Sequence, residues 1–453
     1  MRLTFVGQSE RDDDNISGNT SRLVNFYREP LGPGGKASHV LKGVQRTNAW
    51  AVMPKIFVRD MHVIGGKFYV LADDTLYEVT AAASKVELGA TASAEGAMIF
   101  GAEDGLVCIV GDGRYWVWDG SVMSEPTPGA FNAFGSGVFL GDYVVLTEKD
   151  GRRFQWSALA NAKSLPGTNF ATAESTDKNI LRAMSLQGRL ILMKEDAIEM
   201  WALTGGSNAD AFALVPGGVS EIGLKAPHLA TRFVGGIAFV GNNDIAYVSG
   251  GTLPQPISTP AVNTALAQGT PTHCFSYEDE GHIFIAIRFA DRPAWVYDVA
   301  TQEWHERASG RDEPWRVTVT AKAFGHWHAG DAFGNVYRLA RAGEDEGGDL
   351  IRTAVSSTLY NDGRSFTVPM LEFTGNMGMG DLTGTPSLML RMSRDGGRTW
   401  GRERSRSLGA LGEYARTCEF RALGWFKKQA CAEVRLSDAR DIALDAAANV
   451  EVA

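Results

Sequence analysis

The sequence predicts an all-β fold: a β-propeller of six or seven blades with an N-terminal arm and a C-terminal β segment. The first observation is a pattern that recurs seven times, a hydrophobic strand, a turn rich in Gly, Asp and Asn, and a second strand ending in aromatic or aliphatic residues. The second is the spacing of these copies, 37 to 48 residues between equivalent positions. Strand-containing repeats of roughly 40–50 residues are typical of four-stranded propeller blades. The equivalent positions are Phe68, Val107, Val144, Leu190, Ala238, Phe284 and Trp327.

The composition is that of a folded, turn-rich protein. Glycine accounts for 52 of 453 residues while 44% of residues are hydrophobic, so the glycine belongs to turns and not to disorder. The formal net charge is −9, which argues against a broad basic surface that binds phosphates by releasing counterions. Any contact with nucleic acid is therefore expected to be local or repulsive.

The cysteines and the start of the chain indicate a cytoplasmic site of synthesis. Cys108, Cys274, Cys418 and Cys431 form no C-x-x-C pair, and we interpret them as small buried hydrophobic residues in a reducing compartment. The first residues lack the apolar core of a signal peptide. No stretch approaches the ~18–20 apolar residues of a membrane span.

The repeats divide the chain into segments. Residues 1–60 show little periodicity and are expected to form an arm over the body, whereas residues 61–342 hold the hairpins of the propeller. Polar insertions at 158–176 and 254–272 lengthen the repeat spacing, as loops on one rim would. The second insertion predicts one short helix, because Thr259 can cap it and Pro260 fits the first helical position.

The glycine-rich stretch 343–349 predicts a boundary, and residues 350–453 are expected to form a separate β segment or to complete the propeller. In an Asp-box turn the carboxylate accepts from backbone N–H groups, glycine takes positive φ, and the tryptophan wedges into the sheet. Such a motif staples a hairpin without chemistry of its own, so Trp400→Ala is expected to cost about 3–5 kcal/mol. The members of the Asp-box here are Ser393, Asp395, Gly397, Thr399 and Trp400.

Aromatic residues recur near the ends of the predicted strands. They could fill the wedge between neighbouring blades or form a stacking platform for bases. Burial between blades is favoured, because the acidic charge balance supplies no electrostatic groove to accompany stacking. Examples are Tyr115, Trp116, Trp118, Trp304 and Trp315.

No catalytic, metal or cofactor site is predicted. A glycosidase on an Asp-box propeller would need paired carboxylates, or a Tyr–Glu nucleophile beside an arginine cluster, and the sequence supplies no such framework. His326 and His328 could face one metal ion, because residues two apart on a strand share a side. No third ligand is identifiable by spacing, so both are interpreted as hydrogen-bonded side chains beside Trp327.

A basic cluster in the C-terminal segment is the candidate contact zone for an anionic partner. Alternating arginines on an exposed sheet face that only keeps the protein soluble would give the same pattern, and the sequence leaves both interpretations open. The cluster comprises Arg391, Arg394, Arg398, Arg402, Arg404 and Arg406.

Three stretches in combination resemble a known family. They are RLVNFYREP at 22–30, RDMHVIGGKFYV at 59–70 and LRMSRDGGRTWG at 390–401. In this order, with Ser407-Leu-Gly and Gly412-Glu-Tyr414 after them, they look like the packaged-DNA stabilisation proteins of P22-like short-tailed bacteriophages, which are tail-nozzle or tail-hub components. One departure is the ending, 442–450, which runs longer than the short ending expected for the family.

The resemblance implies a non-enzymatic structural component of the virion tail. A nozzle subunit would form a homo-hexameric ring below the portal and its adaptor, contact other tail proteins, extend the DNA channel and help retain the packaged genome. DNA would pass along a negative lumen without sequence-specific binding, and no cofactor or small-molecule substrate is expected. Two alternatives are an Asp-box propeller that binds or hydrolyses host glycans and a kelch-like adaptor with a cellular partner.

Overall fold

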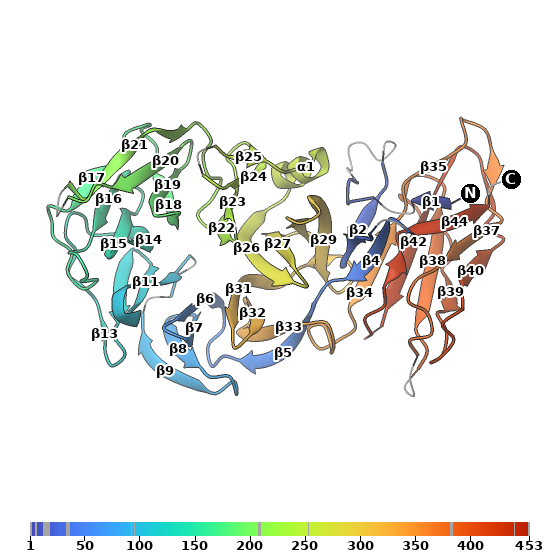
Figure 1. The fold of residues 1–453 in the computed structure, drawn as a ribbon, viewed down its shortest axis with the longest axis horizontal. Helices are drawn as coiled ribbons and strands as arrows, with labels where there is room; N and C mark the ends of the chain where they lie inside the picture. Colours follow the sequence, from blue (N-terminus) through green and yellow to red (C-terminus); the bar gives the residue numbers. More distant parts are fainter. Residues whose placement is uncertain are drawn as a thin grey trace.

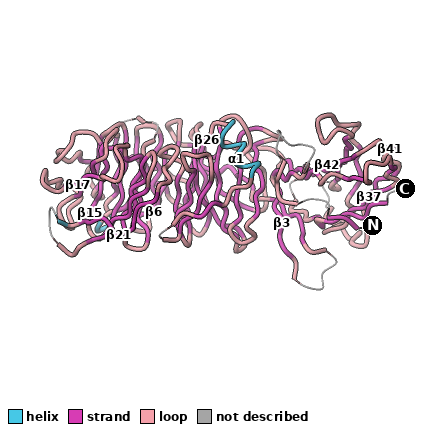
Figure 2. Tube along the Cα trace, turned by 90° about the horizontal axis from the view of Figure 1, so that it is seen from above, coloured by secondary structure: helices cyan, strands magenta, loops and turns pink. Residues whose placement is uncertain are grey.

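The computed structural model describes residues 2–4, 7–11, 19–32, 37–91, 93–94, 96–206, 210–251, 253–380, 384–438 and 440–451. Its strands build two bodies, a ring of blades and a β-sandwich at one side of that ring (Figure 1). Seen from above, the ring is a thick disk and the sandwich continues along the same long axis (Figure 2). No helix in the described ranges is long and apolar enough to cross a membrane.

The ring has seven four-stranded antiparallel blades, which confirms the predicted propeller and fixes the blade count. Blade one holds β6 (Val58–Ile64), β7 (Lys67–Ala72), β8 (Thr75–Val79) and β9 (Lys85–Ala90). Blade two holds β10 (Met98–Gly101), β11 (Val107–Gly111), β12 (Arg114–Trp118) and β13 (Met123–Ser124). Blade three holds β14 (Phe134–Leu140), β15 (Tyr143–Glu148), β16 (Arg153–Trp156) and β17 (Phe170–Thr172). Blade four holds β18 (Ile180–Leu186), β19 (Arg189–Lys194), β20 (Ile198–Leu203) and β21 (Phe212–Ser220).

The remaining blades follow the same order, except that the last one borrows a strand. Blade five holds β22 (Ala230–Phe233), β23 (Gly236–Val240), β24 (Ala246–Ser249) and β25 (Gln255–Pro256). Blade six holds β26 (Pro271–Asp279), β27 (His282–Phe289), β28 (Ala294–Asp298) and β29 (Glu303–Ser309), with the short β30 (Glu313–Pro314) paired to the end of β29. Blade seven holds β31 (Val317–Ala323), β32 (His326–Asp331), β33 (Asn335–Ala340) and β5 (Arg46–Val52).

The seven recurring hairpins of the sequence are the second and third strands of the blades. These strands are buried almost throughout, as in β7, where Phe68 to Ala72 are all buried. Both of their faces are covered because a blade lies on either side. The aromatic residues fill these wedges as predicted: Trp116 and Trp118 are buried between blades one and two, and Trp315 lies in the core between blades six and seven.

The ring is closed by a strand from before the first blade. β5 pairs antiparallel with β33, and the register runs from Arg46 opposite Ala340 to Val52 opposite Asn335. Closure therefore comes from within the segment expected as an arm, and the C-terminal segment takes no part in it. The added strand gives blade seven the four strands of the other blades and leaves only the short outer edges usual for propellers.

The predicted helix in the second insertion is present as α1 (Pro260–Gln268), between blades five and six. Thr259 is its N-cap, and its hydroxyl oxygen accepts from the Val262 backbone N–H at 3.5 Å. Val262 and Leu266 are fully buried in the core that these blades share. The helix thus fills the wedge where blade five has only the two-residue strand β25.

The C-terminal body is a β-sandwich of two main sheets. The first has the order β1 (Arg2–Thr4), β44 (Ala447–Glu451), β37 (Met370–Phe373) and β40 (Cys418–Arg421). The second runs β34 (Ile351–Val355), β42 (Gln429–Ser437), β38 (Ser387–Ser393) and β39 (Arg404–Ser407), with β35 (Leu359–Tyr360) also on β42. Smaller sheets complete it: β3 (Phe26–Pro30), β4 (His39–Gly43) and β43 (Leu444–Asp445), and the pair β36 (Phe366–Thr367) and β41 (Trp425–Phe426).

One sheet passes from the propeller into the sandwich. β2 (Arg22–Val24) pairs parallel with β29 of blade six and antiparallel with β34 of the sandwich. Arg22 on this strand donates to both oxygens of Glu306 on β29, at 2.8 and 2.6 Å. The two bodies are therefore joined by continuous backbone hydrogen bonding as well as by the chain.

Candidate functional site

The Asp-box forms the turn that follows β38, and its hydrogen bonds are those expected of a staple. The Asp395 carboxylate accepts from the Thr399 backbone N–H at 2.8 Å and from the Thr399 hydroxyl at 2.5 Å. The Ser393 hydroxyl lies 2.7 Å from the same carboxylate and accepts from the Gly397 N–H at 2.8 Å. Gly397 has φ +85°, a conformation that favours glycine.

The turn keeps Asp395 ionised. Partial burial alone would raise the pKa of the carboxyl, but the hydrogen bonds from Thr399 and Ser393 stabilise its charged form and lower the pKa to about 2. Both carboxylate oxygens are used inside the turn. The arrangement stabilises a hairpin and leaves this group no part in acid–base chemistry.

Trp400 lies differently from the wedge that the motif predicts. Its side chain is only partly buried, and the Arg391 guanidinium covers its ring with 4.7 Å to the ring centroid. Arg391 in turn makes two hydrogen bonds to the Glu433 carboxylate, at 2.7 and 2.6 Å. The ring is therefore held between the turn and a fixed cation, with one side open to solvent.

Beside this turn lies a groove of about 740 Å³ that gathers most of the predicted arginine cluster. Its walls come from β38, the Asp-box turn, β39 and the segment around β41, where Leu423 and Phe426 supply an apolar floor. Arg398 does not line the groove and is exposed on the turn. The arginines that line it are Arg391, Arg394, Arg402, Arg404 and Arg406.

The local contacts of these arginines leave four positive charges without an acidic partner. Arg404 donates to the Arg421 carbonyl oxygen at 2.7 Å, and the guanidinium of Arg394 lies 5.5 Å from the Phe426 ring centroid. The one acidic residue in the groove, Glu403, is paired with Arg435 at 3.0 Å. Within the described ranges no carboxylate reaches ion-pair distance of Arg394, Arg402, Arg404 or Arg406, and all four are exposed.

Such a groove is suited to binding and not to bond chemistry. The planar guanidinium fork matches carboxylate and phosphate groups with two parallel hydrogen bonds. Because each side chain is exposed, a single pair would contribute only about 0–1 kcal/mol, and a useful contact needs several arginines at once. The groove therefore presents several guanidinium donors together on one exposed face.

Comparison with protein-family models places a boundary between residues 342 and 352, where the structure passes from the propeller to the sandwich. Residues 37–342 match the model described as the β-propeller of bacteriophage P22 Gp10, and residues 352–453 match the model of the β-sandwich of the same protein. The chain belongs to the P22 Gp10 family. It is thus a structural protein of the phage particle with a tail or stabilisation role, which confirms the resemblance seen in the sequence.

Other comparisons add little to the Gp10 assignment. The search of curated proteins found no significant match. Among solved structures, BamB from Moraxella catarrhalis has 12% identity and a TM-score of 0.40, with 75% of this chain and 97% of that chain covered. A chain of the mitotic checkpoint complex has 12% identity and a TM-score of 0.47, with 69% and 95% covered. Likenesses at these TM-scores carry no conclusion about function.

The two histidines singled out in the sequence, His326 and His328, have different surroundings in this Gp10 relative. His326 is exposed and contacts Arg338, whereas His328 is buried with its ring 4.5 Å from that of Trp50. Burial lowers the pKa of His328 to about 4, so it stays neutral at physiological pH. In the parts of the chain that the structure describes, no group of three metal-ligating side chains occurs.

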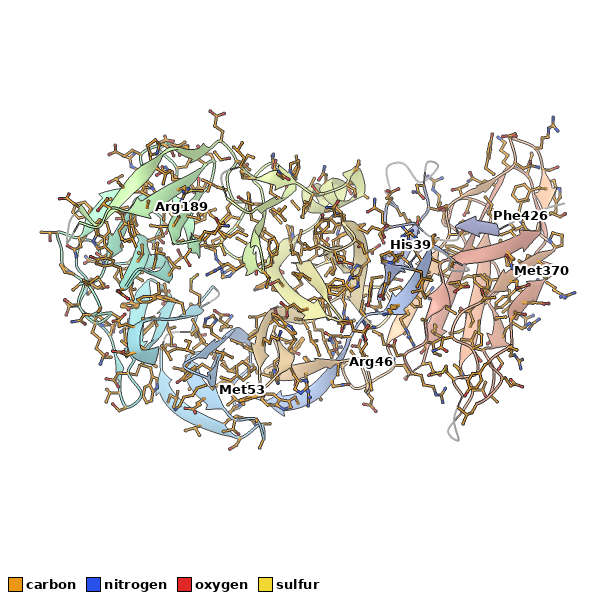
Figure 3. The ribbon with its side chains drawn as sticks, viewed as in Figure 1. His39, Arg46, Met53, Arg189, Met370 and Phe426 are labelled. Carbon is orange, nitrogen blue, oxygen red and sulfur yellow. The ribbon has the colours of Figure 1, made fainter. Side chains whose placement is uncertain are left out.

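Glu433 and Arg435 were not identified from the sequence, although they bond to Arg391 and Glu403 of the arginine groove. Glu433 and Arg435 lie on β42, next to β38, and the Arg435 guanidinium donates to Glu433 at 3.0 Å. The alternation Glu433-Val434-Arg435 was a usable signal, because residues two apart on a strand share a face. Figure 3 shows that side chains cover both bodies densely. The pairing of β38 with β42 is what identifies Glu433 and Arg435 as neighbours of the groove.

Proposed function

We propose that this chain is a non-enzymatic subunit of the tail nozzle, which assembles as a homo-hexameric ring below the portal and its adaptor. Membership of the Gp10 family over both bodies carries the proposal. The sheet that joins blade six to the sandwich supports it, because a subunit under pressure from packaged DNA must not bend between its domains. In this ring the subunits extend the DNA channel and help to retain the genome.

The genome passes between subunits and not through a single propeller. The central cavity of the propeller measures about 580 Å³ and is lined by residues of all seven blades. A B-form duplex is too wide for such a space, because a single one of its grooves, the major groove, is already about 12 Å across. The net charge of −9 suits a conduit, since every phosphate that a wall residue neutralises adds binding that ejection must break.

The arginine groove is a contact to a neighbouring tail protein or subunit. Its four unpaired, exposed guanidinium groups stand out on a chain with an overall acidic balance. An acidic surface of the neighbour would satisfy them, and each bidentate pair would also fix orientation. Charge complementarity of this kind speeds assembly and selects the partner more than it adds affinity.

Gene deletion with complementation tests the proposal. Lysates of the deletion mutant should contain heads that package DNA but leak it and lack the lower tail when imaged by electron microscopy. Arg402→Glu/Arg404→Glu should reproduce the incomplete tails. The matched control Lys85→Glu/Arg152→Glu makes the same charge change at exposed propeller positions and should restore infectious particles.

Three outcomes would overturn parts of this proposal. Unaltered, infectious particles from the deletion mutant would refute a tail role. Filled and tailed particles that fail to adsorb would indicate recognition of host glycans instead of genome retention. Normal tails from the Arg402→Glu/Arg404→Glu variant would leave the nozzle role standing but remove the groove from assembly.

A further inference from the structure

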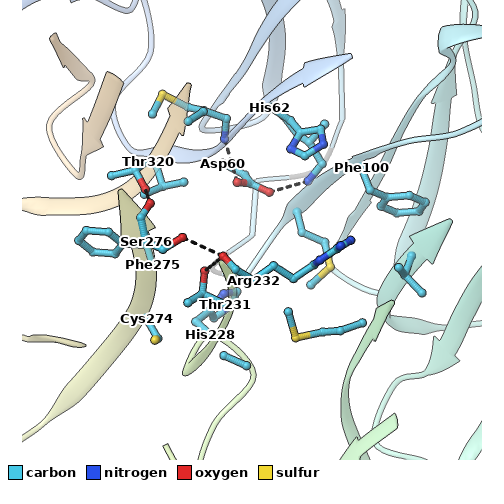
Figure 4. Close-up of a pocket in the computed structure, with 18 of the residues that line it drawn as sticks. Asp60, His62, Phe100, His228, Thr231, Arg232, Cys274, Phe275, Ser276 and Thr320 are labelled. Atoms are coloured by element: carbon cyan, nitrogen blue, oxygen red, sulfur yellow. Dashed lines mark hydrogen bonds between the residues drawn. The ribbon is translucent and has the colours of Figure 1, made fainter. Parts of the chain in front are cut away.

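The central channel of the propeller carries polar groups that the tail role does not use. Its wall is made by the first strands of the blades, β6, β10, β14, β18, β22, β26 and β31. The close-up in Figure 4 shows Asp60 and His62 from blade one across the cavity from His228, Arg232 and Ser276 of blades five and six. The cavity of about 580 Å³ lies within the range of roughly 300–1,000 Å³ seen for small-molecule sites.

Hydrogen bonds between neighbouring blades stiffen this wall. The Asp60 carboxylate accepts from the backbone N–H of Ile99 in blade two at 2.7 Å, and also from Met61 at 2.8 Å. The Ser276 hydroxyl donates to the Arg232 carbonyl at 2.8 Å, and both bonds are drawn in Figure 4. Both oxygens of Asp60 are thus occupied by the backbone.

A cluster of one arginine and two histidines lies where three of these strands begin. Arg182 of blade four donates to the Pro227 carbonyl oxygen at 2.9 Å, and this places it beside His228. The rings of His228 and His273 are 5.5 Å apart, and the buried Nδ1 of His273 has no hydrogen-bond partner among the described residues. Across those same residues no carboxylate comes within ion-pair distance of Arg182; the Asp60 carboxylate acts on its charge from farther away, and backbone N–H groups already bond to both Asp60 oxygens.

The surroundings keep the two histidines neutral and the arginine charged. Burial, together with the charge of Arg182, lowers the pKa of His228 to about 4. Burial, His228 and nearby arginines lower the pKa of His273 to about 3. Burial also lowers the pKa of Arg182, yet a guanidinium remains protonated in proteins. At neutral pH the cluster therefore offers one positive charge and two ring N–H donors.

We propose that the propeller channel binds a small oxyanion-bearing molecule at Arg182, His228 and His273. The Arg182 fork takes two oxygens of a phosphate or carboxylate, and the imidazole N–H groups donate to the remaining oxygen. The cavity is larger than a bare oxyanion requires, so the ligand is a small organic phosphate or polycarboxylate and not a macromolecule. Bound there, it links blades four, five and six and stiffens the ring.

Calorimetric titration of the full chain with inorganic phosphate and with citrate, at pH 7.5 and constant ionic strength, tests this site. At least one probe should bind the native protein, and Arg182→Gln should weaken that binding tenfold or more. Arg152→Gln is the matched control, because it removes an exposed arginine that lies outside both the channel and the arginine groove, and it should leave the affinity unchanged. The probe that binds more tightly identifies the class of oxyanion.

A second measurement needs no variant. The bound probe should protect His228 and His273 from modification by diethyl pyrocarbonate, followed by peptide mass spectrometry, while the exposed His326 reacts equally with and without it. The proposal is overturned if neither probe binds at 10 mM, if Arg182→Gln retains native affinity, or if Arg152→Gln weakens binding as much. Equal modification of His228 and His273 in the presence of a bound probe would also contradict it.

Discussion

The propeller and the sandwich hold their strands together in opposite ways. Six of the seven blades are made of consecutive strands, so most pairings join neighbours in the sequence. In the sandwich, β44 near the C-terminus pairs with β1 at the N-terminus and with β37, and β42 joins β34 to β38. The propeller is therefore a set of locally paired blades with one long-range pairing, β5 with β33, that closes the ring. The sandwich instead depends on contacts between the two ends of the chain.

This difference between local and long-range strand pairing explains which strand pairs can be predicted from the sequence. A repeated hairpin is readable because its strands and turn lie within about 20 residues, which is why all seven copies were found. Pairing between residues such as Arg2 and Asn449 leaves no local trace. The same contrast makes the two bodies respond differently to substitution, and each prediction below compares them.

The largest effect is expected in the wedge between blades. Trp156→Ala removes a fully buried ring at the interface of blades three and four, whose centroid is 5.2 Å from that of Phe212. The free energy of unfolding should fall by about 3–5 kcal/mol, as for other large-to-small core changes. Chemical denaturation measures it, with Trp425→Ala on the exposed face of the sandwich as the control. Equal losses for both variants would contradict the packing described here.

The second largest effect is expected from a substitution at the junction of the two bodies, which should uncouple the unfolding of the propeller from that of the sandwich. Glu306→Gln removes the negative charge that pairs with Arg22 across the β2–β29 junction and leaves Asp312, at 2.9 Å, as the remaining acidic partner of a largely buried guanidinium. We expect a loss of about 2–3 kcal/mol, below the 3–5 typical of fully buried pairs. In differential scanning calorimetry we expect one transition for the native chain and two for the variant. One unsplit transition would mean that the shared sheet does not depend on this pair.

A smaller effect is expected at the Asp-box tryptophan. Trp400 is only partly buried beneath Arg391, so the sequence-based value of 3–5 kcal/mol is too large. Trp400→Ala should cost about 1–2 kcal/mol, from part of the area term and one cation–π contact. Thermal denaturation next to Trp156→Ala measures the difference. A loss as large as that of Trp156→Ala would show that the ring wedges into the sheet after all.

The smallest effect concerns pH. Because the folded pKa of Asp395 is depressed to about 2, its stabilisation is fully present above the unfolded value of about 3.9 and is lost as pH falls toward 2. The carboxyl is largely solvated, so after allowance for screening this contributes about 1 kcal/mol. Asp395→Asn should therefore be less stable than the native chain at pH 7 and should approach it at pH 2–3. A constant difference across this range would exclude the carboxylate as the cause.

Particular residues show how far the sequence could lead. The Asp-box turn at 393–400 and the cap of α1 at Thr259 were predictable, because a side chain bonds to backbone only three or four residues away. The closing strand β5 was not, because it lacks the partner hairpin that marks every repeat. The cluster of Arg182, His228 and His273 was also out of reach, since its members come from three blades and share no motif. The orientation of Trp400 depends on Arg391 and Glu433, which only strand pairing brings together.

The central claim is that the chain is a tail subunit that acts as one rigid body. Cryo-electron microscopy of complete virions, followed by fitting of the propeller and sandwich together, tests it most directly. We predict several copies in a ring below the portal, with the joined bodies fitting without a hinge and the arginine groove facing a neighbouring protein. Absence of the fold from the virion, or its presence only in the capsid shell, would contradict the account.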